Sequence, residues 1–279
     1  MRLLIQFLAV AAVAAAGSAG IAAVQGDPWQ TLGLGVATAV IAMLAYVGVV
    51  RVTERRTPVE VGLRGAVPSL VRGLLIGTAL FSTVIGAIAA LGGYRVNGTG
   101  SATGAAALFG FMTAAAVTEE LLFRGVLFRI VDGRIGTWGA LALSAVLFGL
   151  SHLTNPHASL WAATAIAIEA GVMLAAAYTA TRTLWVPIGL HLGWNFAESG
   201  IFGTEVSGRR HWAGLLDGAT SGSSLVSGGQ FGPEASLPAV VAGTLLTIGF
   251  LVLAHRRGHL VSRRRRHPAP GEPVATLTP

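Results

Sequence analysis

The feature that most constrains this chain is a series of long apolar runs separated by connections that carry arginine. About eight runs near the ~20-residue length that spans a bilayer as a helix can be identified. They cover residues 3–24, 31–50, 69–92, 105–131, 137–154, 160–181, 184–202 and 237–254. Only 11% of the residues are charged, against about 25% in soluble domains. We therefore predict an all-α polytopic membrane protein with about eight transmembrane helices.

The arginines predict the orientation of these helices. An even number of spans puts both termini on one side, and the basic tail HRRGHLVSRRRRH (255–267) indicates that this side is the cytoplasm. The connections then assigned to the cytoplasm carry Arg51, Arg55, Arg56, Arg64, Arg134 and Arg182. Those on the other side carry Arg95, Arg209 and Arg210. This asymmetry follows the positive-inside rule, so we expect both termini to be cytoplasmic and the protein to be multi-pass in a bacterial cytoplasmic membrane.

The two ends of the chain each allow a second interpretation. The first run could be a signal peptide, but its length fits an uncleaved span better than the ~7–15-residue core of a signal. The basic tail could bind nucleic acid, but an apolar run directly precedes it, so we interpret it as an anchor beside anionic headgroups. We expect no nucleic-acid partner.

Composition and motifs divide the chain into four parts. Residues 1–104 form an N-terminal three-helix membrane region, and residues 105–208 form a catalytic core. Residues 209–255 comprise a long Gly- and Ser-rich loop and the last transmembrane helix. Residues 256–279 form a basic cytoplasmic tail that is Pro-rich at its end and predicted to be disordered.

Two adjacent glutamates and an arginine interrupt the fourth apolar run, in VTEELLFRG (117–125). Ionisable residues at hydrocarbon depth are costly, so their first interpretation is functional. On a helix Glu120 and Arg124 are i,i+4 neighbours, whereas Glu119 points about 100° away. We expect Arg124 to hold Glu120 as a bidentate partner, and Glu119, which lacks a local cation, to act as a general base. A purely structural ion-pair network is the alternative.

Three further polar clusters fall within the apolar runs. Phe148 and His152 share a helix face in FGLSH (148–152), where His152 is either catalytic or a helix–helix hydrogen-bonding residue. His191 and Asn195 share a face in HLGWN (191–195); both could stabilise a developing oxyanion, although polar packing is the commoner role of such a pair. Glu169 has no partner within one turn, and either supports the site from behind or faces a water-filled cavity.

The spacing of two clusters predicts that they meet. A turn at DGRIG (132–136) would join the fourth and fifth runs as an antiparallel hairpin. Glu119 precedes this turn and His152 follows it by similar lengths of chain, which correspond to ~21–24 Å at ~1.5 Å per helical residue. The sequence therefore predicts that Glu119 faces His152 at one depth in the bilayer.

The three motifs in this order resemble those of the CAAX protease-like proteins, also called the Abi family or CAAX proteases and bacteriocin-processing enzymes. EELLFR (119–124), FGLSH and HLGWN match the family patterns EExxxR, FxxxH and HxxxN. The resemblance covers about residues 105–208 and implies an α-helical intramembrane endopeptidase without a nucleophilic side chain. It implies that Glu119 and His152 activate water and that His191 and Asn195 form the oxyanion hole. Glu120, Arg124 and Phe148 would organise the site.

The resemblance favours catalysis without a metal. Zinc is the alternative cofactor, with Glu119, His152 and His191 as its ligands, since these are the ligand types of catalytic zinc sites; no HExxH occurs in the chain. The expected partners are the lipid bilayer and a membrane-associated peptide or protein substrate, which could be prenylated at its C-terminus.

Two other functions remain open at this point. One is a non-catalytic binding or immunity protein of the same fold. The other is a proton-coupled transporter using Glu119, Glu169 and His152 as a relay, which the lack of an evident inverted repeat disfavours.

Overall fold

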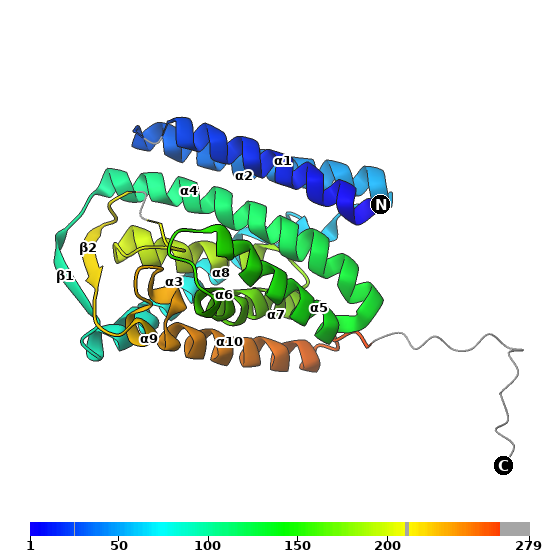
Figure 1. Cartoon of the computed structure of the whole chain (residues 1–279). Helices are drawn as coiled ribbons and strands as arrows, with labels where there is room; N and C mark the ends of the chain where they lie inside the picture. The colour runs from blue at the N-terminus through cyan, green and yellow to red at the C-terminus, as the bar shows by residue number, and fades with distance from the viewer. Residues whose placement is uncertain (25, 210–211, 263–279) are drawn as a thin grey trace, which may run out of the picture.

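Helices dominate the computed structural model, which describes residues 1–24, 26–209 and 212–262 (Figure 1). The long helices are α1 (Arg2–Ala23), α2 (Pro28–Glu54), α3 (Ala66–Ala90), α4 (Ala102–Glu120), α5 (Arg129–Ser151) and α10 (Leu237–Arg256). The shorter ones are α6 (Leu160–Ile166), α7 (Met173–Thr181), α8 (Trp185–Asn195) and α9 (Ser224–Ser227). Three π-helical segments continue α4, α6 and α8 respectively: η2 (Leu121–Phe128), η4 (Ala167–Val172) and η5 (Phe196–Ile201). The prediction of an all-α membrane protein is confirmed.

Within the described residues, six helical stretches are long and apolar enough to cross a membrane. One of them, Ala102–Thr154, combines the fourth and fifth predicted spans. Gly136, with φ 80° and ψ 167°, breaks the helix geometry inside that stretch and makes the predicted hairpin turn. The seventh predicted span corresponds to α8 with η5, 11 and 6 residues, which is shorter than the others. The number of spans therefore stays a prediction.

Side chains cap the starts of three long helices, α2, α4 and α10. Asp27 accepts hydrogen bonds from the backbone N–H groups of Trp29 and Gln30 at the start of α2, and Pro28 occupies the first helical position. Ser101 and Ser236 cap α4 and α10 in the same way. These caps satisfy N–H groups that have no partner within the helix.

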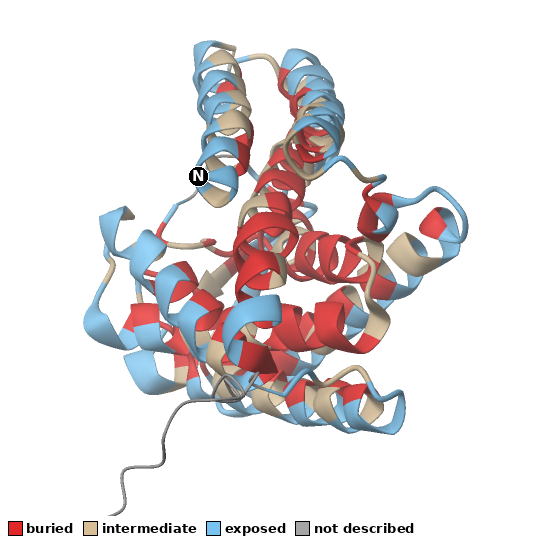
Figure 2. Ribbon diagram, turned by 90° about the vertical axis from the view of Figure 1, so that its right-hand side faces the viewer, coloured by how far each residue is buried: buried red, intermediate tan, exposed pale blue. Residues whose placement is uncertain are grey.

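The helices form layers around a buried centre. α1 and α2 pack together as an outer pair, α2 lies against α4, and α10 covers α7 on the opposite side (Figure 1). Buried residues gather in the central helices, and the outer helices expose much of their surface (Figure 2). The exposed side chains include many leucines and valines, as expected for a surface that faces lipid.

Paired glycines bring α3 against α8. Gly73 and Gly77 on α3 face the backbone of α8, and Gly189 and Gly193 on α8 face the backbone of α3. Both helices thus carry a small-xxx-small pattern, which lets helix backbones approach closely in membranes. Because His191 lies between the two glycines of α8, this contact fixes the helix that carries two predicted site residues.

The fold also contains a pair of strands that the sequence did not predict. β1 (Tyr94–Thr99) pairs antiparallel with β2 (Leu216–Thr220) and joins the connection before α4 to the long loop after η5. The hydroxyl of Tyr94 also donates a hydrogen bond to the carbonyl of Phe202. These contacts hold the loop over one end of the bundle.

The two ends of the bundle differ in charge. Met1, the end of α10 and the connections that carry Arg55, Arg134 and Arg182 lie at one end, whereas β1, β2 and the long loop lie at the other (Figure 1). Of the predicted basic tail, residues 263–279 lie outside the described residues.

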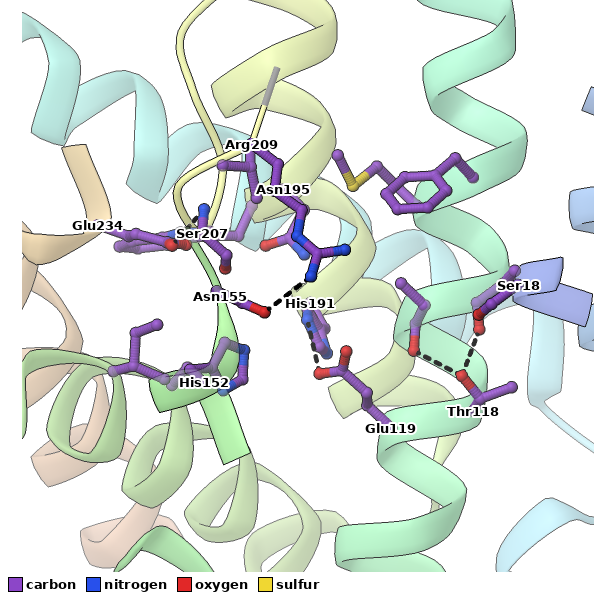
Figure 3. Close-up of a pocket in the computed structure, with 18 of the residues that line it drawn as sticks. Ser18, Thr118, Glu119, His152, Asn155, His191, Asn195, Ser207, Arg209 and Glu234 are labelled. Atoms are coloured by element: carbon purple, nitrogen blue, oxygen red, sulfur yellow. Dashed lines mark hydrogen bonds and ion pairs between the residues drawn. The ribbon is translucent and has the colours of Figure 1, made fainter. Parts of the chain in front are cut away.

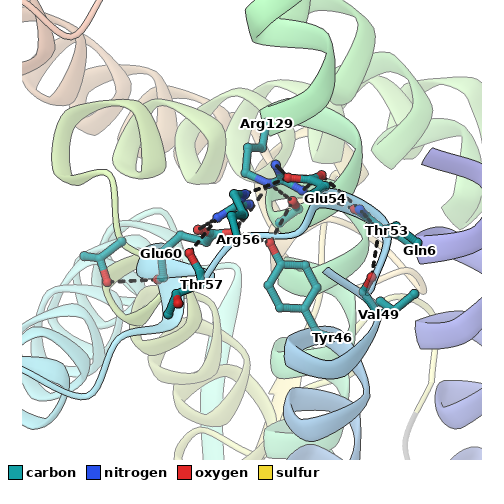
Figure 4. Close-up of polar contacts among 11 residues, drawn as sticks. Gln6, Tyr46, Val49, Thr53, Glu54, Arg56, Thr57, Glu60 and Arg129 are labelled. Carbon is teal, nitrogen blue, oxygen red and sulfur yellow. Dashed lines mark hydrogen bonds and ion pairs between the residues drawn. The ribbon is translucent and has the colours of Figure 1, made fainter. Parts of the chain in front are cut away.

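An ion-pair network closes the arginine-rich end (Figure 4). Arg129 donates to both carboxylate oxygens of Glu54, at 2.9 and 2.8 Å, and Arg56 donates to both oxygens of Glu60, at 2.8 and 2.7 Å. The hydroxyl of Tyr46 lies 2.6 Å from Glu60 Oε1 and 3.0 Å from the carbonyl oxygen of Gly125 in η2. Burial raises the pKa of Glu60, but hydrogen bonds from Arg56 and Tyr46 outweigh burial and hold that pKa below its usual range.

Candidate active site

A cavity of about 400 Å³ lies among the helices and is lined in part by the long loop that contains β2. Side chains from α1, α4, α5, η4, α8 and the loop after η5 line it (Figure 3). All four residues predicted as catalytic lie in its wall: Glu119, His152, His191 and Asn195. Phe148 and Glu169 line it as well. The structure thus brings the three sequence motifs together around one cavity.

Glu120 and Arg124 lie behind the cavity wall and are wholly buried. Arg124 Nη1 donates to Glu120 Oε1 at 2.8 Å, as the i,i+4 spacing predicts. The predicted bidentate geometry is wrong, because Nη2 instead donates to the carbonyls of Ala170 and Gly171, at 3.0 Å each. These carbonyls belong to η4, where the π-helical pattern changes the backbone hydrogen bonding. The guanidinium also stacks 4.6 Å from the ring centre of Phe148.

His191 lies between the two glutamates. Its Nδ1 is 3.1 Å from Glu120 Oε1, and its Nε2 is 3.9 Å from Glu119 Oε2. Because the carboxylate can only accept, Nδ1 carries a proton directed at Glu120. Arg124, Glu120, His191 and Glu119 therefore form a continuous chain of polar contacts. Glu120 fixes the orientation of the imidazole, as carboxylates do for functional histidines in other sites.

Glu119 and His152 line the same cavity from opposite walls (Figure 3), and the histidine beside Glu119 is His191. Helix α5 ends at Ser151, and His152 follows in a short 3-10 turn. His152 Nδ1 is 2.8 Å from the carbonyl oxygen of Phe148. A carbonyl can only accept, so the proton is on Nδ1 and Nε2 is left as an acceptor.

Asn195 follows His191 by one helical turn and lines the cavity, half-buried. Glu169 also lines it from η4, and its Oε2 is buried without a hydrogen-bond partner among the described residues. Helix α10 packs closely against Glu169. A Cβ at Gly243 of α10 would lie 2.6 Å from the Cα of Glu169, so this position requires glycine. Of the two readings of Glu169, the structure favours the one in which it faces the cavity.

Sequence reasoning missed several polar residues of the cavity. Asn155, Ser207 and Arg209 come from loops, Glu234 comes from the short 3-10 helix η6 (Pro233–Ala235), and Trp194 comes from α8. No apolar run contains the loop residues, so hydropathy offers no signal for them. Trp194 lies inside the HLGWN motif, and its position beside two polar residues could have identified it.

The described residues include no group of three or more His, Asp or Glu side chains placed to hold a metal ion. Glu119 and His191 approach each other, but His152 lies on the opposite wall (Figure 3).

Comparison with protein families identifies the segment around this cavity. Residues 101–197 match the model described as "Type II CAAX prenyl endopeptidase Rce1-like". No curated protein and no solved structure matches the chain significantly. The matched segment contains all three motifs, Glu119–Arg124, Phe148–His152 and His191–Asn195. The resemblance predicted from these motifs is confirmed: residues 101–197 are similar to the CAAX prenyl endopeptidase family.

Proposed function

We propose that the protein is an intramembrane endopeptidase that hydrolyses a peptide bond of a membrane-associated protein or peptide. The observation that carries this proposal is the polar chain Arg124–Glu120–His191–Glu119, which ends at a cavity. Buried ionisable groups are costly within a membrane. A chain of them that leads from a wholly buried arginine to a cavity-lining carboxylate is the arrangement that water activation requires.

Glu119 is the general base in this proposal. Its side chain is 32% exposed, whereas that of Glu120 is fully buried, so of the two adjacent carboxylates only Glu119 can meet a water molecule in the cavity. The 3.9 Å between Glu119 Oε2 and His191 Nε2 is too long for a direct hydrogen bond, so this carboxylate is not held by the histidine. His152 presents an acceptor Nε2 from the other wall and assists in removing the proton. General-base catalysis contributes about 10²–10⁴-fold to the rate.

His191 and Asn195 stabilise the oxyanion in this proposal. Donation from Nε2 requires the imidazolium form of His191, because the other N–H is directed at Glu120. Two carboxylates flank the ring, Glu120 at 3.1 Å and Glu119 at 3.9 Å. The amide of Asn195 supplies a second donor from the same helix face. Glu120, Arg124 and Phe148 hold this arrangement in place from behind.

We propose that no metal takes part, since water activation is accounted for by Glu119 and His152. The substrate class includes chain ends modified by a lipid, because the matched family is described as a prenyl endopeptidase. Both termini are cytoplasmic in this proposal, in agreement with the arginines at that end of the bundle, and the membrane is the bacterial cytoplasmic membrane.

The test uses the full chain purified in detergent and a library of membrane peptides in prenylated and unmodified forms. We expect the wild type to cleave members of the library and Glu119→Gln to lose at least ~10²-fold in kcat. Glu205→Gln is the matched control, because Glu205 lies at the same end of the bundle but does not line the cavity. Equal cleavage by Glu119→Gln and wild type would refute the base assignment.

Two further samples test the alternatives. A chelator should leave the rate unchanged; loss of activity that zinc restores would make Glu119, His152 and His191 metal ligands. Binding of peptides without any cleavage by the wild type would instead support a non-catalytic binding protein.

A further inference from the structure

The segments that carry Arg124 and His191 meet at one glycine near the arginine-rich end of the bundle. Gly125 follows Arg124 in η2 and lies against both Tyr46 of α2 and Leu184, the N-cap residue of α8. A Cβ at Gly125 would lie 3.0 Å from the ring of Tyr46 and 3.2 Å from the side chain of Leu184. The absence of a side chain therefore lets α2, η2 and the start of α8 approach one another closely.

The π-helical pattern of η2 makes the carbonyl group of Gly125 available to side chains. In an α-helix this carbonyl would accept from the backbone N–H of Arg129, one turn later. That N–H is directed at the carbonyls of Arg124 and Val126 instead. The Gly125 carbonyl accepts from the side-chain Nε of Arg129 at 2.7 Å, and the hydroxyl of Tyr46 lies 3.0 Å from it (Figure 4). Two side chains therefore replace a contact that regular helix geometry would supply.

Glu60 connects this point to the start of α8. Its carboxylate Oε1 lies 2.6 Å from the hydroxyl of Tyr46, which shares its one proton between Glu60 and Gly125. Its backbone carbonyl accepts from the N–H of Leu184 at 2.8 Å. Glu60 is only 3% exposed, and Arg56 donates to both of its carboxylate oxygens. This one residue thus contacts η2 through Tyr46 and α8 through its own carbonyl.

The two connected segments carry opposite partners of one contact in the site. η2 begins directly after Glu120, and α8 carries His191. Glu120 Oε1 lies 3.1 Å from His191 Nδ1, so a change in the spacing of η2 and α8 alters this contact. Neither Tyr46 nor Glu60 is among the described residues that line the cavity. Both can therefore affect the reaction only through the side chains that they position.

We propose that Tyr46 and Glu60 are positioning residues of this site, which set the spacing of η2 and α8 and so hold Glu120 against His191. The proposal rests on the proposed endopeptidase function and adds residues, remote from the cavity, on which its rate depends. It also assigns a role to the ion-pair network at the arginine-rich end, which supports Glu60 through Arg56 (Figure 4).

Tyr46→Phe removes the hydroxyl and keeps the ring, so it tests the contact directly. The full chain in detergent is assayed with the peptide library, on monodisperse protein and below the unfolding transition of every variant. We expect kcat to fall about three- to tenfold, which is the scale of one hydrogen bond. KM should stay unchanged, because Tyr46 does not line the cavity. A kcat equal to that of the wild type would refute the proposal.

Two matched controls separate positioning from stability. Tyr178→Phe removes a hydroxyl from the same core, where the ring packs 5.8 Å from that of Phe128 in η2, and it should keep kcat. Gln6→Ala removes a side chain that donates to Glu54 at 2.9 Å in the same network. It should lower the unfolding temperature and keep kcat. If Gln6→Ala lowers kcat as much as Tyr46→Phe does, the rate follows stability and the proposal is wrong.

A double variant tests whether Tyr46 and Glu60 act through one contact. Glu60→Gln keeps the backbone carbonyl and one side-chain oxygen but loses the charge that Arg56 holds. Residues that act together give non-additive effects, so Glu60→Gln should lower kcat less in the Tyr46→Phe background than in the wild type. Equal factors in both backgrounds would contradict a shared role.

A spectroscopic measurement tests the position of α8 without cleavage. The chain has six tryptophans, and labelling with fluorotryptophan gives each a fluorine resonance, among which Trp194→Phe identifies that of Trp194 on α8. We expect Tyr46→Phe to shift this resonance and Tyr178→Phe to leave it unchanged. An unchanged resonance in Tyr46→Phe would overturn the proposal whether or not the wild type cleaves. A shifted resonance without cleavage by the wild type would refute the peptidase and support the positioning role.

Discussion

Replacing Gly193 by alanine tests whether close packing of α8 positions the site. The added Cβ would lie 3.0 Å from both the Cα and the carbonyl carbon of Leu74, and closer still to its carbonyl oxygen. Ordinary contacts of a Cβ begin at 3.4 Å. The atoms it meets belong to the backbone of α3 and cannot rotate away. Helix α8 must therefore retreat from α3, and it carries His191 and Asn195 with it.

The size of the effect follows from these distances. Relief of the contact requires a shift of about 1 Å, and misplacement of catalytic groups by ~1 Å can cost about 10²-fold in rate. Overpacking of a close contact costs about 1–3 kcal/mol in stability. The higher helix propensity of alanine returns at most ~1 kcal/mol. We expect a net loss of about 1–2 kcal/mol for Gly193→Ala, together with a rate reduced by about two orders of magnitude.

The assay pairs this variant with Gly86→Ala on α3. A Cβ at Gly86 would meet nothing within 4 Å, so this change should keep the activity and leave the unfolding temperature equal or higher. Unfolding in detergent is followed by intrinsic fluorescence, and cleavage by the peptide assay described above. If Gly193→Ala unfolds and cleaves as Gly86→Ala does, close packing of α3 against α8 does not position the site.

Three further predictions concern charge and orientation. Arg124→Leu should destabilise the protein by about 3–5 kcal/mol in thermal unfolding, because it leaves the buried Glu120 without its cation. A stability equal to that of the wild type would contradict the buried ion pair between Arg124 and Glu120. The pKa of Glu60 is lower in the folded protein, so its contribution is present above the unfolded pKa of ~4.3 and is lost as pH falls through the folded value. Glu60→Gln should therefore show a smaller loss of unfolding temperature at acid pH, and an unchanged loss would refute this. The chain has no cysteine, so an impermeant maleimide added to intact cells should label Ser224→Cys but not Thr57→Cys; the reverse pattern would invert the orientation.

Local spacing predicted those features that depend on one helix. The i,i+4 contact of Glu120 with Arg124 and the shared face of His191 and Asn195 follow from helix geometry alone. The apolar runs predicted the long helices, because a bilayer leaves few alternatives for such segments.

Features that depend on contacts between distant segments could not be predicted in this way. The Nη2 group of Arg124 donates to two carbonyls of the π-helical segment η4. The i,i+4 spacing contains no information about η4, so it predicted a bidentate contact with Glu120 that does not form. The pairing of β1 with β2 joins residues more than a hundred positions apart. The turn between Val206 and Arg209 is held by hydrogen bonds from the backbone N–H groups of Ser207 to Glu234 and of Gly208 to Phe231, and no local pattern links these segments.

The long loop that lines part of the cavity lies at the opposite end of the bundle from Met1 and the end of α10, and this affects how substrates and inhibitors reach the site. In the orientation that we propose, with both termini in the cytoplasm, the long loop and the part of the cavity that it lines face the exterior compartment. A chain would then reach Glu119 only after export had carried it across the membrane, and the fragments would be released outside the cell. An inhibitor directed at this cavity would then act without entering the cytoplasm.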